Sequence, residues 1–253
     1  MLIKALYDYY DILEKSGKTV PGGCSKVDID YKIILNSEGK IEDIISVKNK
    51  IEYHDKKGKI KTKYVSKQFI MPKRIETSTI KSNFIEHRAL YIFGLNYDKN
   101  KKIFTVFDNK NKAIKSHSDF VKSNLKFIDG IDSPIVNAYR NFIINWKPED
   151  ETENGFLLNL GNEYENAKFI FSLSGFPNIL LHEDEKIKEK NKELLNVETK
   201  GEIKTQCAIT GEERTISRLH GKIKGIVGAN STRNIISLLQ QFFRKFIWKR
   251  TGI

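Results

Sequence analysis

Cysteine is scarce in this 253-residue chain, which contains only Cys24 and Cys207. The two lie far apart, and neither has the spacing of a zinc site or of a disulfide framework. Cys207 also lacks a nearby histidine in the sequence, so its default interpretation is a small buried apolar residue. We therefore expect no metal, no cofactor and no disulfide-stabilised fold.

Long apolar runs are also missing. No run approaches the ~20 residues that cross a bilayer. Charged residues interrupt the first 17 positions, where a signal peptide would need an apolar core. We therefore expect a cytoplasmic protein that does not enter a membrane.

Catalytic motifs are absent from the sequence, apart from one weak match. There is no P-loop, dinucleotide fingerprint, zinc-protease motif or serine-hydrolase elbow. Glu202-Ile203-Lys204 resembles the end of a nuclease E-x-K pattern, but no aspartate is convincingly placed on a preceding strand. We expect a protein without enzymatic activity, with a metal-dependent nuclease as the alternative.

Positive charge is abundant and unevenly distributed. The net charge is +12 and the pI about 9.4. Residues 1–149 hold 28 basic and 18 acidic side chains, residues 150–200 hold 6 and 11, and residues 201–253 hold 10 and 3. Clustered basic side chains favour a nucleic-acid partner. A lysine-rich proteome from an AT-rich genome is the alternative explanation.

The periodicity of apolar residues predicts an α+β fold, with antiparallel β-hairpins and packed helices. We expect helices at residues 2–15, 83–93, 134–146 and 183–195, and loosely helical spacing at residues 103–128. We expect strands at residues 29–35, 41–47, 67–72, 168–173 and 178–181, and a hairpin that turns at Thr210-Gly211.

The most basic internal window is residues 48–74, with ten Lys/Arg and two acidic residues. Its lysines, among them Lys67, Lys73 and Arg74, could follow a nucleic-acid backbone, and its aromatic residues could stack on bases. The alternative is a solvated hairpin whose lysines protect an edge strand. We expect Tyr53, Tyr64 and Phe69 to belong to the core.

A second basic segment spans residues 214–228. Its glycines allow close backbone approach to a ligand, and free backbone N–H groups bind anions. Its basic side chains suit a loop that binds phosphates, although an exposed connecting loop is the alternative. These side chains are Arg214, Arg218, His220, Lys222 and Lys224.

Three stretches together resemble a known family. They are the opening L-I-K-A-L-Y-D-Y-Y, residues 82–94, and above all C-A-I-T-G-E-E…I-S-R-L-H-G-K-I-K-G…G-A from Cys207. Residues 1–237 are similar to the N-terminal part of the large subunit of the type I-C CRISPR Cascade complex, a Csd-type protein.

The resemblance implies a role in CRISPR-Cas antiviral defence. A large subunit of this kind belongs to a surveillance complex guided by crRNA, contacts target double-stranded DNA and recognises the protospacer-adjacent motif. Its partners would be crRNA, the backbone and crRNA-processing subunits of Cascade, and a separate helicase–nuclease. The resemblance carries a nucleic-acid contact role to Arg218, His220, Lys222 and Lys224, and we add Lys81 and Asn83 as candidates.

The resemblance ends near residue 237, and we treat residues 238–253 as a tail outside the family domain. Reading an AT-rich back-translation of this tail in a shifted frame gives N-S-S-F-E-N-L-Y-G-K-E-Q-G, which resembles the family's continuation. We expect a frameshift near codon 238 and a truncated product, which the nucleotide sequence of the gene would settle. The alternative is an amphipathic helix that binds a membrane surface or a partner.

The loop at residues 214–224 yields a first prediction. Replacing Arg218 and Lys222 together by alanine should weaken duplex DNA binding and make it less sensitive to salt, because fewer counterions are released. Electrophoretic mobility shifts measured at several salt concentrations test this. Unchanged binding at low salt would count against a role for this loop.

Overall fold

The computed structural model describes residues 2–55, 57–73, 79–106, 111–198, 204–206, 211 and 213–215. Internal contacts divide the chain into two units, Leu6–Leu195 and a second unit of Met1–Ala5 with Asn196–Ile253. Helices and mostly antiparallel strands make up the larger unit, which confirms the predicted α+β class. None of the described helices is both long and apolar enough to cross a bilayer.

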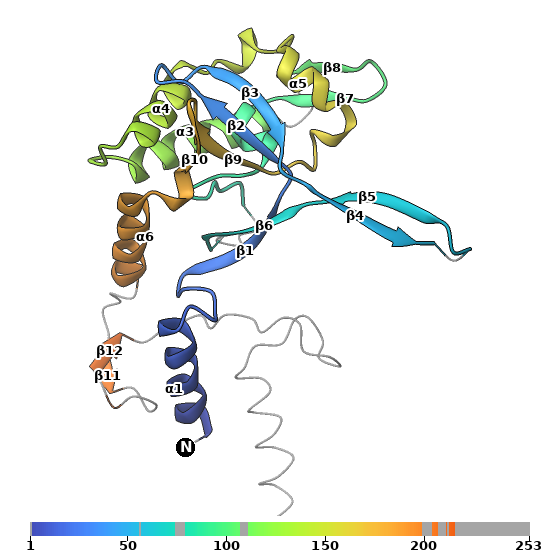
Figure 1. Cartoon of the computed structure of the whole chain (residues 1–253). Coiled ribbons are helices and arrows are strands. Elements are labelled where there is room, and N and C mark those ends of the chain that lie inside the picture. The colour runs from blue at the N-terminus through green and yellow to red at the C-terminus, as the bar shows by residue number, and fades with distance from the viewer. Residues whose placement is uncertain are drawn as a thin grey trace, which may run out of the picture. The chain divides into compact units, whose positions relative to one another are not determined.

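A four-stranded sheet forms the centre of the larger unit, in the order β10-β9-β2-β3 (Figure 1). Its strands are β2 (Tyr31–Leu35), β3 (Ile41–Ser46), β9 (Phe169–Leu173) and β10 (Phe176–Leu180). β2 runs parallel to β9, and the two outer pairs are antiparallel. All five residues of β9 are buried, four of them apolar, as befits a strand at the centre of a sheet.

Helix α4 (Pro134–Asn145) packs on this sheet through aromatic side chains. The rings of Tyr139 and Phe142 lie 4.7 and 5.7 Å from that of Phe171 in β9. The turn between β2 and β3 also lies against α4, where a Cβ on Gly39 would be 2.2 Å from the Phe142 nitrogen. Glycine is required here both by this approach and by its φ of +82°.

A second aromatic group surrounds Phe93 at the end of α2 (Ala89–Phe93). Its ring lies 5.4 Å from that of Trp146, 5.2 Å from Phe169 and 6.0 Å from Tyr164. This cluster joins α2, the end of α4 and the sheet into one core.

The remaining elements complete the two units. β1 (Cys24–Ile29) pairs antiparallel with β6 (Lys67–Pro72) in a separate small sheet. The hairpin of β4 (Asn49–His54) and β5 (Ile60–Val65) follows β3 in the chain and precedes β6. The others are α1 (Leu2–Lys15), β7 (Asn96–Asp98), β8 (Ile103–Thr105), α3 (Lys112–Phe127), α5 (Gly155–Leu160), α6 (Glu185–Glu198), β11 (Lys204–Gln206), β12 (Glu213–Thr215) and the 3-10 turns η1 (Pro148–Asp150), η2 (Gly161–Glu163) and η3 (Leu181–Glu183).

Most of the predicted elements are confirmed. The helix at residues 2–15, the β2–β3 hairpin, the strand that ends at Pro72 and the β11–β12 hairpin all form. The helix at Pro134 begins where expected, because the Ser133 hydroxyl caps it by accepting from the Val136 N–H. The apolar residues Leu6 and Ile12 of α1 are exposed.

Two of the predicted helices are wrong in extent. The segment predicted at residues 83–93 becomes helical only at Ala89, because the Glu86 carboxylate binds the backbone N–H groups of Asn83, His87 and Arg88 before it. Such local side-chain contacts compete with helical hydrogen bonds. The stretch at residues 103–128 begins instead with strand β8, and the helix α3 starts at Lys112.

Asp30 is the junction between the two sheets. Its carboxylate accepts hydrogen bonds from the Ser66 hydroxyl at 2.7 Å and from the Lys168 N–H at 3.0 Å. The N–H groups of Asp30 and Tyr31 donate to the Lys168 carbonyl, and the Asp30 carbonyl accepts from Val47. The end of β1, the start of β9 and both ends of the β4–β5 hairpin therefore meet at one residue.

The turn between β7 and β8 gives a stability prediction. Lys102 has a φ of 55°, although it is not glycine, and its N–H donates to the Asp98 carbonyl at 2.7 Å. Because a Cβ in this region costs about 1 kcal/mol, Lys102→Gly should raise Tm by about 2–4 °C in a thermal melt. Lys101→Gly in the same turn serves as the control and should not stabilise. Equal effects of the two would contradict the argument.

Candidate nucleic-acid interface

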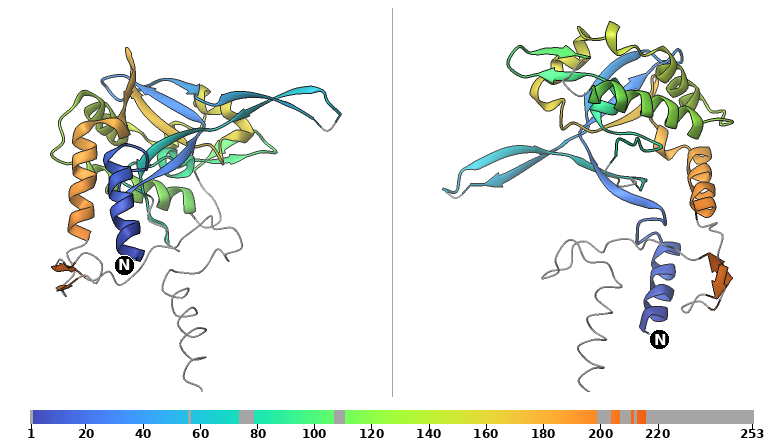
Figure 2. Two further views of the ribbon diagram at one scale, coloured as in Figure 1. Left: turned by 60° about the horizontal axis from the view of Figure 1, so that its bottom comes forward. Right: turned by 180° about the vertical axis from the view of Figure 1, so that it is seen from behind.

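The β4–β5 hairpin extends away from both sheets of the larger unit (Figures 1 and 2). The chain leaves the central sheet after β3, runs out along β4, and returns along β5 into β6. Both strands are exposed along almost their whole length. A two-stranded ribbon that covers no core has little stability of its own. We therefore consider the side chains on its surface and the contacts that hold its base.

The tip of the hairpin is organised by Asp55. Its Oδ1 accepts the backbone N–H groups of Lys57 and Lys59 at 2.8 and 3.0 Å. These hydrogen bonds, from Lys59 and Lys57, hold the pKa of the Asp55 carboxyl below its usual value. Gly58 closes the turn with a φ of +74°. The fixed turn presents the Lys57 and Lys59 side chains to solvent.

One face of the hairpin combines basic and apolar side chains. Opposed residues of an antiparallel pair share a face, and here Ile51 lies opposite Lys63 and Tyr53 opposite Lys61. The Lys63 ammonium lies 5.6 Å from the centre of the Tyr53 ring, while Lys61 pairs with Asp55 at 3.3 Å. Among the described residues, no carboxylate lies within 4 Å of the Lys63 ammonium.

The other face repeats this combination. Tyr64 is 67% exposed and lies opposite Lys50, and Ile60 is 66% exposed and lies opposite His54. Lys50 pairs with Glu52 at 3.4 Å on the same face. One face therefore presents an exposed tyrosine beside Lys61 and Lys63, and the other an exposed tyrosine beside Lys50.

An ion-paired group anchors the base of the hairpin. The Lys48 ammonium binds the Glu163 carboxylate, and the Tyr31 hydroxyl donates to the same carboxylate at 2.5 Å. The hydrogen bond from Lys48 and that from Tyr31 lower the pKa of Glu163. Lys48 is thereby tied to the base of the hairpin, whereas Lys50 and Lys61 pair with carboxylates of the hairpin itself.

The prediction that Tyr53 and Tyr64 belong to the core is wrong, because both lie on a ribbon that covers no core. Phe69, by contrast, is partly buried against the core and meets the ring of His182 edge-on at 5.6 Å. Charged or polar side chains on both faces of β4 and β5 are the sequence signal for an exposed ribbon, which charge counting alone does not reveal.

The described candidate residues lie in three places. Lys67 and Lys73 lie at the two ends of β6, where the Lys67 ammonium sits 5.3 Å from the Phe69 ring and the Lys73 side chain is exposed. Lys81 is also exposed, on the segment before α2. Arg214 belongs to the β11–β12 hairpin of the other unit, opposite Thr205.

Asn83 is only 7% exposed, and neither its amide nitrogen nor its amide oxygen has a hydrogen-bond partner among the described residues. It sits beside a buried pair in which Glu86 binds Arg88 at 2.6 Å. Burial alone would raise the pKa of Glu86, but the Arg88 guanidinium outweighs this and lowers it. This pair fixes the segment that carries Lys81 and Asn83.

Several sequence predictions lie outside the described residues. They concern Arg74, Arg218, His220, Lys222 and Lys224, the Glu202-Ile203 pair of the nuclease alternative, and the tail at residues 238–253. Their roles stay predictions.

Comparison with known proteins agrees with the resemblance seen in the sequence. Residues 6–250 match a family of CRISPR-associated proteins. The family is the one described as CRISPR-associated protein (Cas_Csd1), and the chain belongs to it. The match covers most of the chain and confirms the resemblance to a Csd-type protein. No curated protein sequence matches the chain.

Proposed function

We propose that this chain is the large subunit of a crRNA-guided type I-C Cascade complex. In this role it binds target double-stranded DNA by contacting the sugar-phosphate backbone of the DNA. Membership of the Csd1 family supports a place in a CRISPR-Cas system. The β4–β5 hairpin is the observation that supports nucleic-acid binding. Each face carries an exposed tyrosine beside one or two lysines, and its tip carries two further exposed lysines.

The two-stranded form of the hairpin suits a duplex. The major groove of B-DNA admits a two-stranded β-ribbon, and lysines along such a ribbon reach the flanking phosphates. Exposed tyrosines stack on unpaired bases without sequence preference. A ribbon with both features can hold a duplex next to a region that is opening.

In this proposal sequence is read by pairing between crRNA and DNA, while the protein recognises the protospacer-adjacent motif and the backbone. The other Cascade subunits hold the crRNA, and a separate helicase–nuclease cuts the target. The chain itself contributes binding and not catalysis, and the pathway it serves is antiviral defence.

Alanine at Lys59 and Lys63 together tests the role of the hairpin. Neither side chain pairs with a described carboxylate, so the fold should be unaffected. The complex is purified with crRNA and the other Cascade subunits, and its affinity for target duplex is measured from 50 to 200 mM salt. Loss of two phosphate contacts should weaken binding about tenfold at low salt and reduce the salt slope by about two.

The matched control is Lys122→Ala with Lys126→Ala, which removes the same charge from exposed positions of α3. The control complex should keep the salt slope of the wild type. Equal effects of the two double variants would show that net charge, and not the hairpin, drives binding. Failure of the wild-type chain to co-purify with crRNA would contradict the proposed place in Cascade.

A further inference from the structure

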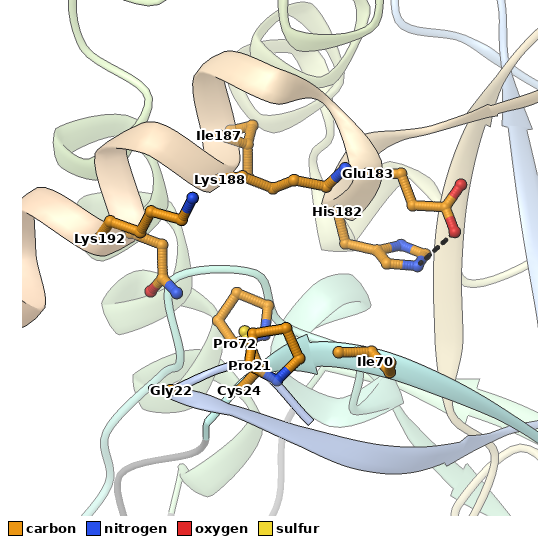
Figure 3. Close-up of a pocket in the computed structure, with 11 residues that line it drawn as sticks. Pro21, Gly22, Cys24, Ile70, Pro72, His182, Glu183, Ile187, Lys188 and Lys192 are labelled. Atoms are coloured by element: carbon orange, nitrogen blue, oxygen red, sulfur yellow. Dashed lines mark ion pairs between the residues drawn. The ribbon is translucent and has the colours of Figure 1, made fainter. Parts of the chain in front are cut away.

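A cavity of about 540 Å³ lies between α6 and the β1–β6 pair (Figure 3). Its volume falls in the range of small-molecule sites. Pro21, Ile70, Pro72 and Ile187 give it largely apolar walls. The edge of the cavity at Gly22 is held in place, because the Gly22 N–H donates to the Glu14 carboxylate at 2.6 Å.

His182 is a buried polar group of this cavity without a hydrogen-bond partner among the described residues. Its side chain is 1% exposed, and neither ring nitrogen has a hydrogen-bond partner among the described residues. The ring projects from η3 into the space between α6 and Ile70 (Figure 3). The nearest carboxylate, that of Glu183, is 3.9 Å away.

The protonation state of His182 follows from its surroundings. Burial, with a smaller effect of Lys188, lowers its pKa to about 4. The imidazole is therefore neutral at physiological pH, with one nitrogen that donates and one that accepts. Two unsatisfied groups in a buried site cost free energy unless a ligand binds them.

Lys188 and Lys192 line the same cavity from consecutive turns of α6. Both are exposed, and Lys188 also pairs with Glu185 at 2.8 Å. Ammonium groups four residues apart on a helix lie on one side and can share an anion. Cys24 lies on the opposite wall (Figure 3), where burial raises the pKa of its thiol.

We infer that this cavity binds a single unstacked nucleotide, with the base against the apolar walls and His182, and the phosphate at Lys188 and Lys192. A neutral imidazole offers one donor and one acceptor, as the edge of a nucleobase requires. A nucleotide is also favoured by continuity with the hairpin. Ile70 and Pro72 belong to β6, which follows β5 directly in the chain. The inference rests in this respect on the proposed function.

Cys24 provides a direct readout of occupancy. In a Cys207→Ser chain it is the single cysteine, and its alkylation by iodoacetamide can be followed by mass spectrometry. Adenosine, guanosine, cytidine and uridine monophosphates are the probes, and ribose 5-phosphate and inorganic phosphate are the controls. At roughly ten times Kd about one tenth of the sites are empty, so a bound nucleotide should slow alkylation about tenfold.

Two variants locate the ligand. Lys188→Ala with Lys192→Ala should weaken protection by nucleotides about tenfold or more, because both phosphate contacts are lost. Lys186→Ala with Lys190→Ala removes the same charge from the same helix outside the cavity and should leave protection unchanged. His182→Phe should weaken protection by the nucleotides while leaving any effect of inorganic phosphate unchanged.

The outcomes separate this inference from the proposed function. Absence of protection by every nucleotide, or equal protection by ribose 5-phosphate, would overturn the nucleotide site even if the hairpin variant lost duplex binding. Protection that depends on Lys188 and Lys192, in a chain whose hairpin variant binds duplex normally, would support the site and contradict the role of the hairpin.

Discussion

The hydrogen bonds of Asp30 join the central sheet, the β1–β6 pair and the base of the β4–β5 hairpin. One carboxylate oxygen binds the Ser66 hydroxyl and the other the Lys168 N–H, and the backbone of Asp30 pairs on both sides. Hydrogen bonds to a carboxylate stabilise the fold more strongly inside a protein than in water, because the local dielectric constant is lower. Because Lys168 also forms a bridge with Arg88, the segment before α2 is tied to the same junction.

This junction explains how a thin ribbon can be positioned without a core beneath it. The hairpin enters at Val47 and leaves at Ser66, and both of these residues bind Asp30. The ion-paired group of Lys48 with Glu163 adds a second attachment one residue further out. Beyond these attachments the β4–β5 pair holds itself through its own ladder and its turn. Its base is therefore fixed, while its outer half presents lysine and tyrosine to solvent.

Local chemistry made several elements predictable. Ser133 and Pro134 mark a helix start, and the alternation from Tyr31 to Leu35 marks a strand, although the predicted strand at residues 29–35 is divided at Asp30 between two sheets. The pairing of β1 with β6 and of β2 with β9 could not be read from the sequence, because each depends on contacts between distant segments. The helix predicted at residues 83–93 was wrong because the Glu86 side chain, and not propensity, decides its start.

The candidate sites, too, are only partly predictable from the sequence. Residues 48–74 were recognised as basic from composition, yet the exposure of Tyr53 and Tyr64 depends on the ribbon leaving the sheet. The sequence shows no sign of a site at His182, because the Glu183 and Asp184 that follow it are typical of the acidic first turn of a helix. Its burial beneath α6, opposite Cys24, is a tertiary property with no local signal.

The parallel pairing of β2 with β9 also means that β2 is synthesised well before its partner strand. Asp30 and Lys168, at the start of this pair, are 138 residues apart. At a translation rate of roughly 5–20 residues per second, β2 waits on the order of ten seconds for its neighbour. During that interval Ile33 and Leu35 belong to a strand with an open inner edge, which other chains can join. Slower translation lengthens the time for which the edge of β2 is exposed. The yield of native protein should therefore depend on chaperones that cover nascent strands.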